Sequence, residues 1–155
     1  MKPKVDIKPA TIDDLHAIQS CAEAAYQIYV HKIGRKPAPM VADFEEAISK
    51  QIIFVARLEN IPSNIAGFIV FYKRGDHLHL ENVAVAPKSQ GNGVGRRLVS
   101  FVEQVALEEN CKAVELYTNE KMVENLSLYQ RLGYKETERW QEDGFNRVYF
   151  RKELT

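Results

Sequence analysis

Within residues 81–97, a glycine-rich turn joins two contrasting sequence patterns. Alternating β-branched residues lead up to Val85, and a helical pattern that begins with Arg96 and Arg97 follows the turn. Glycine lets the backbone come close to a ligand, and the first N–H groups of a helix have no partner within the helix. The turn therefore predicts a site where main-chain N–H groups bind an anion such as a phosphate.

Two common phosphate-binding motifs do not fit this turn. The dinucleotide fingerprint G-x-G-x-x-G would need a third glycine at Arg96 or Leu98, depending on which glycine pair begins it. A Walker loop needs four residues between its glycines, followed by Gly-Lys-Ser/Thr, and no such run occurs.

The run Gln90-x-x-Gly93-x-Gly95, which follows Val85-x-Pro87, resembles the pyrophosphate-binding motif of the GNAT superfamily. Members of this superfamily are acyl-CoA-dependent N-acetyltransferases. The resemblance implies that the main chain of the turn binds the diphosphate of acetyl-CoA, which acts as the acetyl donor. The residues assigned to this role are Gln90, Gly91, Asn92, Gly93, Val94, Gly95 and Arg96.

The stretch from Asn125 to Tyr134 also resembles the family. Tyr129 matches the tyrosine that acts as general acid, and a phenol can donate a proton to a thiolate whose conjugate thiol has a pKa of about 8.5. Asn125 matches the residue that hydrogen-bonds the arm of the cofactor. The alternative for Tyr129 is simple core packing beside Leu126 and Leu132.

The strand before the turn carries the candidate base. A primary amine with a pKa of about 10.4 is protonated at neutral pH, so a base must remove a proton before attack. The resemblance places a strand carboxylate at Glu81, often acting through water, and His79 is the alternative base. The alternative to a catalytic role is that these polar side chains simply face water on a strand near the surface of the sheet. Strand alternation puts on one face His77, His79, Glu81, Val83 and Val85.

The resemblance also gives the main-chain groups of Val83 and Val85 a role, because the family splays its fourth strand from its fifth and leaves those groups to bind the pantetheine arm. His77-x-His79 lacks a third ligand, so no metal is expected. The acceptor pocket is expected to involve Tyr26, Tyr29, His31, His79 and Tyr117, although the segment after the first helix would equally suit a solvated connection.

Periodicity and turn signals predict seven strands and four helices, with a helix-capping pair at Thr11 and Asp14 and a turn at residues 60–64. This order resembles the complete GNAT fold: an α/β protein with a mixed, mostly antiparallel central sheet and a splayed fourth and fifth strand. A single domain over residues 1–155 is expected. The strands are Val5–Lys8, Gln51–Leu58, Ile65–Lys73, His77–Val85, Ala113–Thr118, Tyr134–Gln141 and Arg147–Glu153, and the helices are Leu15–His31, Val41–Lys50, Val94–Glu109 and Met122–Leu132.

The amino-acid composition limits the classes of partner that we expect. The chain has 155 residues, with 21 Lys and Arg against 21 Asp and Glu, so neither nucleic acid nor an anionic membrane is expected as the main partner. No apolar run reaches the roughly 20 residues of a membrane span, and the Met1–Lys4 start lacks the apolar stretch of a signal peptide. We therefore expect a cytoplasmic protein. Cys21 and Cys111 are expected to be small buried residues.

The sequence thus predicts an N-acetyltransferase that transfers an acetyl group from acetyl-CoA to a primary amine by direct attack in a ternary complex, because neither cysteine falls in a nucleophile motif. A subset of bacterial members is similar at residues 33–40 and 117–122, which does not identify the acceptor. The resemblance also implies a homodimer. The alternatives are a non-catalytic acyl-CoA-binding sensor or interaction domain, and a nucleotide-binding regulator that uses the same turn.

Overall fold

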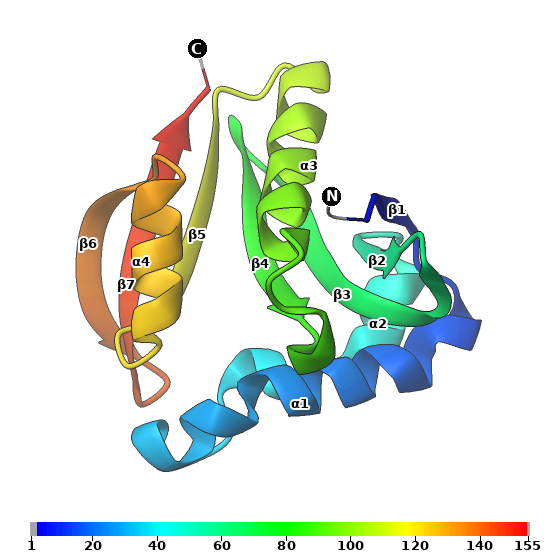
Figure 1. Ribbon diagram of the computed structural model, residues 1–155. Helices are drawn as coiled ribbons and strands as arrows, with labels where there is room; N and C mark the ends of the chain where they lie inside the picture. The colour runs from blue at the N-terminus through cyan, green and yellow to red at the C-terminus, as the bar shows by residue number, and fades with distance from the viewer. Residues whose placement is uncertain (1–2, 155) are drawn as a thin grey trace. The chain divides into compact units, whose positions relative to one another are not determined.

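Seven strands in a mixed sheet and four α-helices account for most of residues 3–154, the part of the chain that this computed structural model describes (Figure 1). The strand order in the sheet is β1-β2-β3-β4-β5-β7-β6. The strands are β1 (Val5–Pro9), β2 (Ile53–Leu58), β3 (Ile61–Arg74), β4 (His77–Val85), β5 (Ala113–Asn119), β6 (Lys135–Glu142) and β7 (Phe145–Glu153). The helices are α1 (Leu15–Ile33), α2 (Phe44–Ser49), α3 (Val94–Glu108) and α4 (Val123–Arg131).

The chain divides into two compact units that interleave in sequence. The first comprises residues 3–71 and 82–100, and the second comprises residues 72–81 and 101–154. Three elements, β3, β4 and α3, run from one unit into the other.

In the first unit, β1, β2 and β3 pair antiparallel, from Val5↔Leu58 through Ile53↔Val70. The predicted capping pair precedes α1: the main-chain N–H of Thr11 donates to Asp14 Oδ2 at 2.9 Å. The helix ends at Gly34, whose left-handed φ of 89° lets its N–H bond to the Val30 carbonyl. The predicted start of this helix is confirmed.

Gly67 on β3 marks a close approach inside the first unit. A Cβ at this position would lie 2.4 Å from the main-chain oxygen of Ala84 on β4 and 3.3 Å from side-chain atoms of Leu98 and Val94 on α3. Only a hydrogen fits, because the nearest atom belongs to the backbone.

We expect Gly67→Ala to lower the free energy of unfolding by about 1–3 kcal/mol or more, since strand and helix must move apart to admit the methyl group. Urea denaturation measures the loss. Gly95→Ala is the matched control, because its Cβ would meet only Val85 Cγ2 at 3.5 Å, an ordinary contact. Equal losses in both variants would contradict the close approach.

In the second unit, β4 pairs parallel with β5, from His77↔Ala113 to Leu80↔Leu116, and β4 is joined to β5 through α3. β7 lies antiparallel between β5 and β6, as Figure 1 shows. The hairpin from β6 to β7 closes at Asp143 and Gly144, both with positive φ, which is the geometry of a two-residue turn. The predicted connection there and the predicted mixed sheet are confirmed.

Alternation gives the sheet of this unit two different faces. One face is apolar and fully buried, and α4 packs on it through Tyr129, whose ring lies 6.1 Å from that of Phe150. The residues of this face include Leu78, Leu80, Val114, Leu116, Val148 and Phe150. The other face carries aromatic and charged side chains.

Two predicted elements were wrong in extent. The turn expected at residues 60–64 is confined to Glu59 and Asn60, because β3 begins at Ile61 and an irregular register beside Arg57 and Leu58 absorbs the next residues into the strand. The helix expected over 41–50 begins only at Phe44, since the Asp43 carboxylate accepts the N–H of Glu46 at 3.0 Å and so caps the helix there.

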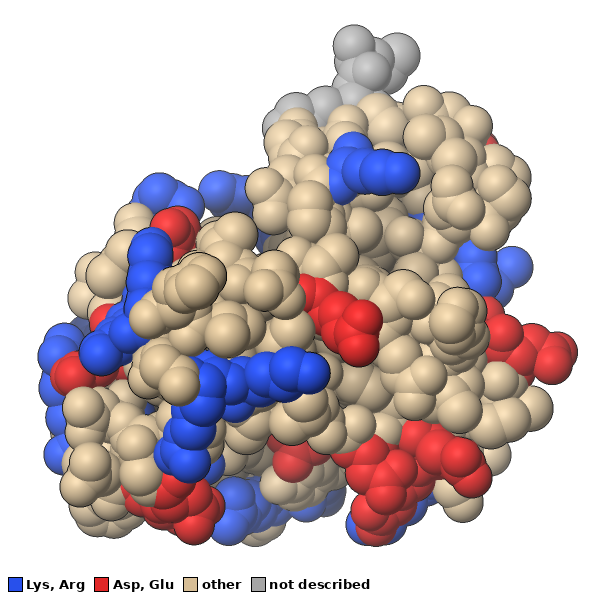
Figure 2. Space-filling model, turned by 90° about the horizontal axis from the view of Figure 1, so that it is seen from below, with Lys and Arg blue, Asp and Glu red and all other residues tan. Residues whose placement is uncertain are grey.

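Other features of the described chain bear on the predicted partners. None of its helices combines the length and the apolar character that crossing a bilayer requires. Met1 and Lys2, which belong to the start that lacks a signal-peptide pattern, lie outside the described residues. Cys21 and Cys111 are buried and free, as predicted. Basic and acidic side chains both occur on the face drawn in Figure 2.

Candidate functional site

The glycine-rich turn of the first unit presents unpaired main-chain donors. Gly91 and Gly93 have φ values of 86° and 76°, which glycine adopts without strain. The first main-chain bond of α3 runs from Arg97 N–H to the Gly93 carbonyl at 3.0 Å. Within residues 3–154, the N–H groups from Gly91 to Arg96 bond to no main-chain acceptor. These donors, at the positive end of the helix dipole, form the kind of site that binds a phosphate.

Tyr26 and Tyr29, both predicted for the acceptor pocket, lie in the core of the first unit, each 5% exposed. The Tyr26 hydroxyl is 2.7 Å from Asn82 Oδ1 and 2.9 Å from the main-chain oxygen of Val83. Asn82 in turn donates to the Pro39 carbonyl at 3.0 Å. Tyr26 therefore ties α1 to the end of β4. His31 is exposed near the end of α1.

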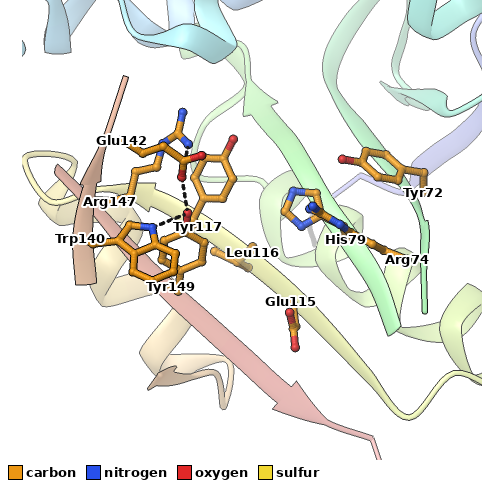
Figure 3. Close-up of a pocket in the computed structure, with 10 residues that line it drawn as sticks. All are labelled: Tyr72, Arg74, His79, Glu115, Leu116, Tyr117, Trp140, Glu142, Arg147 and Tyr149. Atoms are coloured by element: carbon orange, nitrogen blue, oxygen red, sulfur yellow. Dashed lines mark hydrogen bonds and ion pairs between the residues drawn. The ribbon is translucent and has the colours of Figure 1, made fainter. Parts of the chain in front are cut away.

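A pocket of about 360 Å³ opens on the polar sheet face of the second unit (Figure 3). Two of the predicted acceptor-pocket residues, His79 and Tyr117, line it together. The complete lining is Tyr72, Arg74, His79, Glu115, Leu116, Tyr117, Trp140, Glu142, Arg147 and Tyr149.

His79 is the most enclosed polar group of this pocket, with 6% exposure. Its ring lies 5.4 Å from that of Tyr72 and 5.7 Å from that of Tyr117. Burial lowers the pKa of His79 to about 4, and the positive charge of Arg74 acts in the same direction. The imidazole is therefore neutral at pH 7, and within the described chain it forms no hydrogen bond or ion pair.

The lowered pKa of His79 predicts a loss of stability in mild acid. The pKa in the folded state, about 4, lies below the ordinary value of 6.5. The neutral imidazole therefore makes its full contribution to the free energy of unfolding above pH 6.5, and this contribution is lost as pH falls toward 4. The shift corresponds to about 3 kcal/mol. Denaturation at pH 7.5 and 4.5 should show a smaller loss for His79→Gln than for the wild type.

His16→Gln, which alters an exposed histidine on α1, is the control and should lose as much stability as the wild type. If His79→Gln also follows the wild-type pH profile, the buried neutral imidazole does not contribute.

A network of hydrogen bonds fixes the opposite wall of the pocket (Figure 3). The Arg147 guanidinium stacks 4.3 Å from the centre of the Tyr117 ring and lies 2.9 Å from the Glu142 carboxylate. The Tyr149 hydroxyl donates to Glu142 at 2.8 Å and accepts from Trp140 Nε1 at 3.0 Å. This wall is consequently preorganised by contacts among its own members.

Tyr129, the predicted general acid, is 4% exposed on α4. Its ring packs 5.8 Å from that of Tyr134, as the core-packing alternative requires. However, its hydroxyl forms no hydrogen bond with any described residue, whereas the Tyr134 hydroxyl donates to Glu103 at 2.8 Å. Burial raises the pKa of Tyr129, so its phenol stays protonated at neutral pH.

Glu81 and Asn125, also in the second unit, occupy different settings. Glu81 is exposed and follows His79 by two residues along β4. Burial raises the pKa of Tyr117, the charge of Arg147 lowers it, and the charge of Glu81 raises it. Glu81 is therefore near enough to this pocket residue for its charge to act on the phenol. The Asn125 side chain contacts Met122 Sδ at 3.6 Å.

Sequence reasoning missed most of the pocket. The available signal was strand alternation, which sets Glu115 with Tyr117 on β5 and Arg147 with Tyr149 on β7. The register then places Tyr117 opposite Tyr149 and Trp140 opposite Arg147. Among residues 3–154, no group of three or more His, Cys, Asp or Glu side chains is arranged to hold a metal ion.

Comparisons with known proteins identify the fold. The family model for the acetyltransferase (GNAT) family matches residues 16–134. The thialysine N-ε-acetyltransferase of Bos taurus is 30% identical over 70 residues, 43% of this chain and 41% of that protein, so the match spans about two fifths of the relative's length.

Solved structures agree over nearly the whole chain. A GCN5-related N-acetyltransferase from Rhodopseudomonas palustris has a TM-score of 0.78 and 18% identity, covering 99% of this chain and 98% of that one. The PaiA N-acetyltransferase from Thermoplasma acidophilum, in complex with coenzyme A, has a TM-score of 0.73 and 14% identity, covering 97% and 99%. The predicted fold is confirmed, and the predicted acyltransferase is confirmed at the level of the family.

Proposed function

Because the chain belongs to the acetyltransferase (GNAT) family, we propose that it is an N-acetyltransferase that transfers an acetyl group from acetyl-CoA to a primary amine. The observation that carries the proposal is the turn from Gly91 to Arg96, whose main-chain N–H groups are free to bind a diphosphate. The PaiA neighbour is a complex with coenzyme A. The bovine relative is named for acetylating the ε-nitrogen of thialysine, which agrees with an amine acceptor.

Binding of the donor is assigned to several main-chain and side-chain groups. The N–H groups from Gly91 to Arg96 bind the diphosphate, next to Gln90, whose N–H donates to the Pro87 carbonyl at 3.4 Å. The positive end of the α3 dipole adds to the attraction. Main-chain groups of Val83 and Val85 hold the pantetheine arm, and the Asn125 amide hydrogen-bonds it. The paired register of β4 and β5 ends at Leu80↔Leu116, before Val83 and Val85, which supports this assignment.

Proton transfer is assigned to Glu81 and Tyr129. The Glu81 carboxylate takes a proton from the ammonium, directly or through water, and the freed amine attacks the thioester carbonyl in a ternary complex. The C–N bond forms, the C–S bond breaks, and the Tyr129 phenol gives its proton to the departing thiolate. The second proton that the nitrogen loses restores the phenol. His79 is the alternative base, because its buried imidazole is neutral at pH 7 and can accept a proton.

We further propose that residues 1–155 act as one catalytic domain, since the family match over 16–134 takes in parts of both units. Two free cysteines suit a reducing compartment, which favours the cytoplasm as the place of action. A homodimer stays a prediction.

The function is tested with the purified full chain. CoA should raise the melting temperature strongly, and pantetheine, which lacks the diphosphate, should raise it much less. In a thiol-release assay with acetyl-CoA, a panel of primary amines should contain acceptors that accelerate release and become acetylated.

Two results would replace this proposal. If CoA stabilises the protein but no amine accelerates thiol release, the chain is an acyl-CoA sensor. If ATP displaces acetyl-CoA and binds more tightly, the turn serves a nucleotide-binding regulator.

A further inference from the structure

The pocket of the second unit contains a cation that no protein group neutralises. Of its charged lining residues, Arg147 pairs with Glu142 at 2.9 Å. Glu115 pairs with Arg151, and His77 Nε2 lies 3.3 Å from it. Arg74 forms neither an ion pair nor a hydrogen bond within residues 3–154. Its guanidinium is therefore available to a ligand.

A carboxylate is the ligand group that best fits a free guanidinium. The planar fork of arginine binds the two oxygens of a carboxylate through two parallel hydrogen bonds. A second cation near Arg74 would instead be repelled, which disfavours a polyamine acceptor. The remaining charges of the lining are already paired, so they do not favour a highly charged ligand of either sign.

The same pocket offers neutral groups to an amine. The His79 imidazole is 6% exposed and neutral. It forms no hydrogen bond or ion pair in the described chain. The Tyr117 hydroxyl likewise forms no hydrogen bond within residues 3–154. Figure 3 shows His79 between Arg74 and Tyr117, and Arg74 is close enough for its charge to act on the imidazole. Groups for an amine nitrogen and for a carboxylate thus share one cavity.

We propose that this pocket binds the acceptor as a small zwitterion, an amine that also carries a carboxylate such as a free amino acid, and that Arg74 selects for the carboxylate. The proposal rests on the proposed acetyltransferase function. A volume of about 360 Å³ lies at the lower end of the range for small-molecule sites, which suits a single amino acid. The aromatic walls from Tyr72 and Tyr117 would cover its apolar part.

The test compares amines that differ only in the carboxylate: lysine with 1,5-diaminopentane, and phenylalanine with phenethylamine. Calorimetry on the full chain measures binding, and thiol release from acetyl-CoA measures turnover. For at least one pair, the wild type should bind the amino acid at least tenfold more tightly than its decarboxylated counterpart. Arg74→Gln should abolish most of that difference, mainly through KM for the amino acid.

Lys73→Gln is the matched control, because it removes the same charge from the adjacent exposed position of β3, which does not line the pocket. It should keep the wild-type preference. The proposal is overturned if neither amino acid is preferred in binding, or if Arg74→Gln keeps the preference. Failure of the acetyltransferase function would appear separately, as amino-acid binding without thiol release for any amine.

Discussion

Replacing Tyr129 with phenylalanine is expected to lower kcat for acetyl transfer by about 10²-fold or more and to leave the free energy of unfolding nearly unchanged. The phenol is the proposed donor to the departing thiolate, and without it the sulfur must leave as an anion. The buried ring is preserved in phenylalanine. The lost hydroxyl has no hydrogen-bond partner among the described residues, so no protein group is left unsatisfied. Steady-state kinetics and urea denaturation measure the two quantities.

Tyr134→Phe is the matched control, because this neighbouring buried tyrosine shows the opposite arrangement. Its hydroxyl donates to Glu103, which also pairs with Lys152 at 3.1 Å. Removing it should cost about 1–3 kcal/mol of stability and leave the chemical step intact. If Tyr129→Phe instead retains full kcat, Tyr129 is a packing residue and another group protonates the sulfur.

Replacing Glu81 with glutamine is expected to lower kcat/KM by about 10²–10³-fold at pH 7. Glutamine keeps the shape of the side chain but cannot accept a proton. An amine with a pKa of about 10.4 loses its proton unaided as pH rises, so the defect should shrink about tenfold for each pH unit up to that value. A pH–rate profile for both enzymes with one acceptor measures this convergence.

Two further variants sharpen the result. Glu138→Gln removes an exposed carboxylate from β6, outside the pocket lining, and should leave the profile unchanged. His79→Gln separates the two candidate bases. A defect that shrinks with pH in His79→Gln, but not in Glu81→Gln, would assign proton removal to the imidazole and contradict the role given to Glu81.

Local patterns predicted the elements well where a residue's environment depends on its near neighbours. Glycine at positions 91 and 93 indicated a turn before a helix, and both residues lie in such a turn with positive φ. Asn110, with a φ of 59°, lies just past the end of α3, where asparagine tolerates the left-handed conformation. The prediction of a turn at residues 60–64 was wrong because Pro62 and its polar neighbours suit an irregular strand edge as well as a turn. Composition does not distinguish these two.

The pocket depended on information that alternation does not contain. Trp140 and Tyr149 are brought together by the β6–β7 register, and Tyr117 meets Tyr149 only because β7 lies between β5 and β6. Tyr26 showed the converse problem. A tyrosine within a helix can face a substrate or bond to a neighbouring strand, and here its hydroxyl reaches Asn82 and Val83.

The interleaving of the two units limits how this chain can be divided into fragments. Each unit is assembled from two stretches of sequence, so no single cleavage point yields both units intact. A truncation after Ser100 would retain every residue of the first unit, yet it would leave His77–Leu80 without β5, their parallel neighbour. Such fragments would therefore expose an unpaired strand edge, which favours aggregation over a smaller working module.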